Sequence, residues 1–149
     1  MLSSLPRHRH VKYKYTVVSG AQTIGGRFVK RPAVQIEISR GKQARTFLAI
    51  IDSGADNIIL PAYMAELFSI DRASCRPYSV IGISMENTPG FVAELHFRLQ
   101  NHSQVFTAPV VFIDNDVPPL LGQEGFFDIY RIKFEKDHDS FEITSPPRR

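Results

Sequence analysis

The chain of 149 residues is long enough to bury the core of one domain. Its apolar fraction of 43% and charged fraction of 22% are ordinary for a soluble globular protein, and no apolar run approaches the ~18 residues of a membrane helix. Residues 1–15 are basic and polar, without the apolar run of a signal peptide. The single cysteine, Cys75, excludes an internal disulfide and fits a reducing compartment, so we expect a cytoplasmic protein.

Short strands follow one another along the chain, because apolar and polar residues alternate in many brief runs. The expected strands cover residues 13–17, 33–39, 46–51, 58–60, 78–83, 91–99, 105–113, 130–134 and 140–143. Pro109 cannot donate to a strand ladder, so it predicts that residues 105–113 form an edge strand or contain a bulge. Short helices are expected over 62–68, directly after Pro61, and within 122–130.

Many short strands with one or two short helices favour an all-β barrel or sandwich over a parallel βαβ fold. We expect a basic N-terminal extension over residues 1–25, one domain over 26–144, and a loose tail over 145–149.

The charge of the chain is unevenly distributed. Residues 1–45 carry ten Lys/Arg and one acid, Glu37, whereas residues 46–149 carry eight Lys/Arg and fourteen acids, so the net charge changes from +9 to −6. A basic head can contact nucleic acid, an acidic partner or a membrane surface. The head contains no recognised binding motif, however. We therefore interpret it as a solvated extension and expect neither a membrane nor nucleic acid as a partner.

Asp52 stands at the end of an apolar strand and is followed by Ser53 and Gly54. The serine hydroxyl can donate a hydrogen bond to a neighbouring group, and the glycine allows the backbone to turn tightly and approach a neighbour or a substrate. Asp-Ser-Gly alone also occurs in ordinary solvated turns, so its context decides the interpretation.

Four features supply that context, in chain order. They are the motif Ile50-Ile51-Asp52-Ser53-Gly54-Ala55, the strand and short helix over 58–70, a hairpin over 80–91 with Gly82 and Gly90 at its rim, and Pro119-Leu120-Leu121-Gly122 followed by Phe126-Phe127-Asp128. With these motifs, residues 34–143 resemble the retropepsin-like aspartic proteases. This family includes the retroviral proteases, the protease domain of DNA-damage-inducible ubiquitin-shuttle proteins, and small bacterial relatives.

The resemblance implies a closed barrel of short antiparallel strands with a flap hairpin and one or two short helices. It implies an aspartic endopeptidase that is active as a homodimer without a cofactor, since one chain supplies one of the two aspartates. Two such carboxylates share one proton and activate water against a peptide bond. The substrate is then an extended peptide or protein segment, cleaved between hydrophobic residues.

The resemblance also assigns the site residues. Asp52 is the catalytic carboxylate, and Ser53 and Gly54 support its loop. The substrate-binding residues are Ala55, Asp56, Gly82, Ile83, Ser84, Val117 and Leu120. Many retroviral members have an arginine after the glycine of the second motif, but Gln123 stands here and cannot form a salt bridge with Asp56.

Two other functions remain as alternatives. One is a catalytically silent retropepsin-like module that binds peptides or assembles with partners, against which the intact Asp52-Ser53-Gly54 motif argues. The other is a nucleic-acid-binding β-barrel that uses the basic head. It lacks an interleaved aromatic and basic surface. The five histidines show no short metal-ligand spacing, so we expect no metal site.

Overall fold

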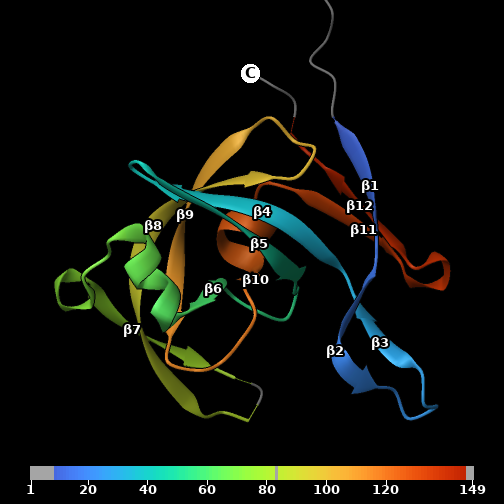
Figure 1. The fold of residues 1–149 in the computed structure, drawn as a ribbon, viewed down its shortest axis with the longest axis horizontal. Coiled ribbons are helices and arrows are strands. Elements are labelled where there is room, and N and C mark those ends of the chain that lie inside the picture. The colour runs from blue at the N-terminus through green and yellow to red at the C-terminus, as the bar shows by residue number, and fades with distance from the viewer. Residues whose placement is uncertain (1–8, 83, 147–149) are drawn as a thin grey trace, which may run out of the picture.

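The computed structural model describes residues 9–82 and 84–146, and these form an all-β fold with a few short helical turns (Figure 1). Ile83 and the two chain ends, residues 1–8 and 147–149, lie outside the described residues. The strands are β1 (His10–Lys14), β2 (Thr16–Gln22), β3 (Phe28–Arg31), β4 (Ala33–Arg40), β5 (Gln43–Ile51), β6 (Ile58–Pro61), β7 (Arg76–Ile81), β8 (Asn87–Leu99), β9 (Val105–Ile113), β10 (Leu120–Leu121), β11 (Arg131–Glu135) and β12 (Ser140–Thr144). The helical turns are η1 (Ala62–Phe68), η2 (Arg72–Ser74), η3 (Gln123–Phe127) and η4 (Lys136–His138).

Six strands close into a barrel in the order β4-β5-β10-β6-β9-β8, and pairing between β4 and β8 completes the ring. Closure removes the free sheet edges that otherwise invite aggregation. The closed barrel confirms the predicted fold class. Its pairings are not all antiparallel, however, because β5–β10 and β6–β9 run parallel. Strand β7 pairs with β8 outside the ring and forms the predicted flap hairpin.

Strand β9 differs from the prediction that Pro109 suggested. It is an inner strand between β8 and β6, and Pro109 lies opposite Glu94 of β8 without a shift in register. Pairing with β6 starts only at Val110. Pro109 therefore lies just beyond the end of that ladder, where its missing N–H removes no bond to β6.

The barrel encloses a continuous hydrophobic core. On β4, Val34, Ile36 and Ile38 are at most 1% exposed, as their alternation with polar residues predicts. Aromatic pairs fill the space between strands, with the Phe91 and Phe112 rings stacked at 5.1 Å between centroids. Burial of such side chains contributes roughly 1.5–3 kcal/mol each to folding, which makes this core the main stabilising element. Within the described residues, no helix has the length and apolarity needed to cross a membrane.

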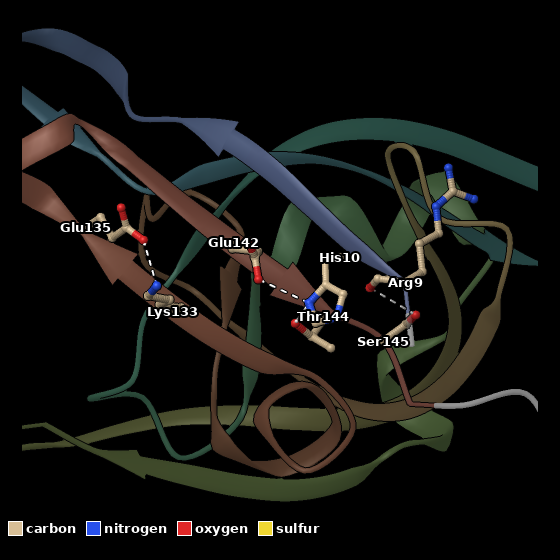
Figure 2. Close-up of polar contacts among 7 residues, drawn as sticks. All are labelled: Arg9, His10, Lys133, Glu135, Glu142, Thr144 and Ser145. Carbon is tan, nitrogen blue, oxygen red and sulfur yellow. Dashed lines mark hydrogen bonds and ion pairs between the residues drawn. The ribbon is translucent and has the colours of Figure 1, made fainter. Parts of the chain in front are cut away.

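The two ends of the described chain meet in a three-stranded sheet of order β1-β12-β11. His10 pairs with Thr144, and its Nδ1 lies 3.1 Å from Glu142 Oε1 and 2.9 Å from Thr144 Oγ1 (Figure 2). The Ser145 N–H donates to the Arg9 carbonyl at 2.9 Å. The opposite face of this sheet joins the barrel core. The N-terminal strand is thus part of the packed structure from His10 onward.

One polar side chain, that of His102, is buried among aromatic rings. His102, in the loop between β8 and β9, is 5% exposed and packs against the rings of Tyr13 and Tyr130. Among the described residues, neither of its ring nitrogens has a hydrogen-bond partner. Burial, assisted by the positive charge of Arg9, lowers the pKa of His102 from its ordinary value of 6.5. The folded chain therefore favours neutral imidazole at this position.

Gly122 lies where two segments of backbone cross. It follows β10, which is inserted between β5 and β6. A Cβ atom at this position would overlap the carbonyl oxygens of Ala55 and Asn57, which are backbone atoms and cannot rotate away. Only glycine allows the two segments to approach this closely.

The Gly122→Ala substitution is therefore expected to destabilise the fold by about 2–3 kcal/mol, because the crossing segments must separate. Urea unfolding followed by circular dichroism measures this change. Gly25→Ala is the matched control, since its added Cβ has no neighbour closer than 3.9 Å, and we expect a change below about 0.5 kcal/mol. Equal stability of the two variants would contradict the crossing described above.

His102 predicts a loss of stability in acid. As the pH falls below about 6.5, the unfolded chain takes up a proton at His102 and the folded chain, with its lower pKa, does not. The free energy of unfolding therefore decreases as the pH falls from 7 to 5. In His102→Phe this slope should be shallower than in the wild type. Urea unfolding at each pH measures the slope, and an equal slope in the two proteins would contradict this prediction.

Candidate active site

Strand β5 delivers Asp52 to the surface of the barrel. It lies between β4 and β10, with Ala49 and Ile51 buried on its inner face. The Asp52 N–H donates to the Leu121 carbonyl at 3.0 Å, so β10 fixes the backbone at the point where the strand ends. The Asp52 side chain is half-buried. Its position is thus set by the sheet.

The loop after Asp52 folds back on its own carboxylate. The Gly54 N–H donates to Asp52 Oδ1 at 2.9 Å, and the Ala55 N–H donates to the Asp52 carbonyl at 3.2 Å. No further hydrogen bond to this carboxylate occurs among the described residues, so Oδ2 is available to water or to another group. Ser53 and Gly54 are exposed beside it.

The segment after Gly122 is hydrogen-bonded to this loop and holds it in place. The Gln123 and Glu124 N–H groups donate to the carbonyls of Ala55 and Asp56 at 2.8 and 2.9 Å. The Gln123 side chain also donates from Nε2 to the Ser53 carbonyl at 2.7 Å. Gln123 thus braces the loop that carries the aspartate, and it does so through backbone and amide bonds without a charge.

The role of Gln123 was not predicted from the sequence, which indicated only that no salt bridge to Asp56 forms. Its signal was the position directly after Gly122. Asp56 is exposed and has no ion pair with any residue in the described part of the chain.

A small apolar cluster lies beside Asp52, separate from the main core. Buried Ile59, Val111 and Ile113 form its floor. The partly buried residues packed against this floor are Ala55, Val80, Val92, Val117 and Leu120. The structure therefore brings together Ala55, Val117 and Leu120, which the sequence assigned to substrate binding. Val80 on β7 and Val92 on β8 also belong to this cluster and were not assigned from the sequence. Their neighbours Ile81, Phe91 and Ala93 are apolar, so alternation offered no signal there.

The tip of the flap hairpin joins β7 to β8 and contains Gly82 and Ser84. The Gly82 N–H donates to the Glu86 carbonyl at 3.3 Å, and the Met85 N–H donates to the Gly82 carbonyl at 2.9 Å. Ile81 and Met85 are 59% and 79% exposed at this tip. Ile83, also expected to contact substrate, lies outside the described residues. The hairpin contacts the apolar cluster through Val80, one residue pair from its tip, so flap and cluster belong to one region.

The described residues contain no group of three or more His, Cys, Asp or Glu side chains placed to hold a metal ion. What the site offers is one carboxylate on a rigid loop, an apolar cluster beside it, and a hairpin with exposed apolar side chains. A single carboxylate can act as a general acid or as a general base.

Comparison with known proteins identifies the fold that carries these residues. No family model and no curated protein matches the sequence. Among solved structures, the chain is similar to a retropepsin-like aspartic protease from Rickettsia conorii, with a TM-score of 0.58 and 14% sequence identity. The match covers 99% of this chain and 100% of that one. The chain therefore has the retropepsin-like all-β fold.

Proposed function

We propose that the chain is an aspartic endopeptidase that is active as a homodimer. The observation that carries this proposal is the placement of Asp52. Its carboxylate is half-buried and accepts the Gly54 N–H, and its loop is fastened by backbone bonds to β10 and to Gln123. Such preorganisation suits an acid–base group, because the geometry is set before a substrate arrives. The fold shared with a retropepsin-like aspartic protease supports the same assignment.

The homodimer follows from the chemistry of peptide hydrolysis. One group must take a proton from the attacking water while another donates a proton to the scissile carbonyl. The motif Asp-Ser-Gly occurs once in the chain, at Asp52. A two-fold axis beside Asp52 brings two copies of it together, and repulsion between adjacent carboxylates makes the pair hold one proton. The pair then titrates as a unit.

The proposed substrate is an extended peptide cleaved between hydrophobic residues. The apolar cluster of Ala55, Val80, Val92, Val117 and Leu120 supports this preference, since it offers apolar contact beside the carboxylate. The backbone of Gly54 and the flap residues Gly82, Ile83 and Ser84 are proposed to bind the peptide main chain, as a strand added to a sheet edge. We assign exposed Asp56 to the rim of this binding surface. Cys75 as the only cysteine supports action in a reducing compartment, for which we propose the cytoplasm.

Asp52→Asn is expected to lower the cleavage rate at least about a thousandfold while preserving the fold, because the amide cannot exchange the required proton. Cleavage of a mixed peptide library between about pH 4 and 7 measures this. Asp137→Asn is the control and should leave the rate unchanged. Asp137 is an exposed carboxylate of the η4 turn and belongs neither to the Asp52 loop nor to the apolar cluster.

Cleavage by pure Asp52→Asn at the wild-type rate would show that Asp52 is not the catalytic carboxylate. Peptide binding by a folded wild-type dimer without cleavage at any pH would instead favour the catalytically silent peptide-binding module.

The shared site makes a second prediction, which concerns mixed dimers. Adding excess Asp52→Asn chain to the wild type should suppress cleavage, since a mixed dimer holds only one aspartate. Sedimentation equilibrium at tens of micromolar should show dimer, and specific activity should rise with protein concentration. A strictly monomeric protein with full activity would contradict the shared site.

A further inference from the structure

Strands β2 and β3 form a two-stranded ribbon that stands apart from the barrel and projects from it, in blue at the lower right of Figure 1. We call residues 16–31 the basic ribbon. No residue of the basic ribbon belongs to either hydrophobic core among the described residues. An isolated two-stranded ribbon is only marginally stable in water, which makes a covering surface advantageous.

The basic ribbon exposes large apolar side chains. Val17 is 50% exposed, Phe28 is 60% exposed, and Ile24 at the tip is completely exposed at 110%. The turn holds Ile24 outward, because the Gly26 N–H donates to the Thr23 carbonyl at 2.9 Å and closes the backbone beneath it. A convex tip with an aliphatic side chain is suited to entering a soft apolar phase.

The ribbon and the strand before it are also free of negative charge. Residues 9–31 contain six Lys/Arg and no Asp or Glu, whereas residues 32–146 contain nine Lys/Arg and fifteen Asp/Glu, a net charge of −6. The basic residues are Arg9, Lys12, Lys14, Arg27, Lys30 and Arg31. Residues of β1 and the ribbon therefore carry only basic charges, of which Lys30 pairs with Asp139 at the ribbon base.

The base of the ribbon is fastened to the body of the protein. Lys30 Nζ lies 3.0 Å from Asp139 Oδ2, and Lys136 Nζ lies 2.9 Å from Asp139 Oδ1. Both ammonium groups hold the pKa of Asp139 below its usual range. A hollow of about 630 Å³ lies at this junction, lined in part by Val17, Phe28 and Val29. The ribbon therefore presents its apolar and basic side chains from a fixed base.

We propose that the basic ribbon is a docking surface for an anionic lipid bilayer. Ile24 and Phe28 enter the headgroup region, while Arg27 and Arg31 contact the lipid phosphates and carboxylates. Basic residues near an anionic bilayer contribute through charge, and apolar residues contribute through burial at the interface. The net charge of −6 on residues 32–146 is repelled by the same surface, which favours orientations that turn the barrel away from it.

The observations favour a bilayer over other acidic partners. Single-stranded nucleic acid is bound through several stacking aromatic side chains along a basic groove, whereas Phe28 is the one aromatic residue of the ribbon and Ile24 at its tip is aliphatic. A protein partner would need a concave surface fitted to Ile24, while a bilayer needs none. This inference replaces the interpretation of the head as a solvated extension, and it does not depend on the proposed proteolysis.

Co-sedimentation of the full chain with vesicles tests the proposal. We expect binding to phosphatidylcholine vesicles containing about a third phosphatidylserine and little binding to pure phosphatidylcholine. Raising NaCl from about 0.05 to 0.5 M should weaken binding at least tenfold, because the charges are exposed and screened. Arg27→Glu/Arg31→Glu should weaken it at least about tenfold, and Ile24→Asp at least about fivefold.

Matched variants outside the ribbon control for net charge and exposed apolar area. Lys42→Glu/Arg45→Glu changes the same charge on the β4–β5 hairpin, and Val105→Asp removes another exposed aliphatic side chain, at 58% exposure. Both should alter binding by less than about twofold. Thermal melting of each variant in the absence of vesicles establishes that it is folded.

Three results would overturn the proposal. The first is equal binding to neutral and anionic vesicles. The second is equal loss of binding in the ribbon variants and their controls. The third is a failure of the folded protein to bind vesicles. It would be accompanied either by tight binding to a single-stranded oligonucleotide or by loss of self-association in Ile24→Asp. That result would assign the ribbon to nucleic acid or to a second copy of the chain.

Discussion

The geometry of the candidate site depends on one close approach of backbone to backbone, at Gly122. Because this residue has no side chain, β10 can lie between β5 and β6 while η3 passes directly under the loop of Asp52. The hydrogen bonds from Asp52, Gln123 and Glu124 all require this crossing. The position of the carboxylate is therefore determined by main-chain atoms, which vary less with side-chain identity than a network of charged groups does.

Gln123 illustrates what this arrangement permits. Its amide reaches the Ser53 carbonyl and supports the loop without a charge. The ion pair that an arginine would form with Asp56 is thus unnecessary for holding the loop, and Asp56 stays exposed. Glutamine can stand in place of arginine at position 123 because three backbone hydrogen bonds already join the loop to the opposing segment.

The sequence predicted the features that depend on local patterns. Alternation on β4 located a strand with one buried face, and Pro61 marked the start of the helical turn η1. The two glycine motifs carried the resemblance that implied the closed barrel, whereas the crossing of their segments at Gly122 was not predicted. Three of the assigned substrate residues, Ala55, Val117 and Leu120, lie in one apolar cluster.

Features that depend on distant pairing were not accessible in this way. Alternation does not reveal strand direction, so the parallel pairings β5–β10 and β6–β9 were missed. Pro109 avoids a position where its missing N–H would break a ladder, as expected, but it lies on an inner strand, next to the end of the β6 ladder. Val80 and Val92 become part of the site only because β7 and β8 pair in a particular register.

The pairing of β1 with β12 has a consequence for how the molecule is made. His10 and Thr144 are neighbours in space but lie at opposite ends of the described chain. During synthesis, the first strand must wait unpaired until the last strand leaves the ribosome, and contacts of such long sequence separation form slowly. The barrel around Asp52 can begin to assemble earlier, but its terminal sheet closes last. Completion of this sheet therefore depends on the synthesis of β12.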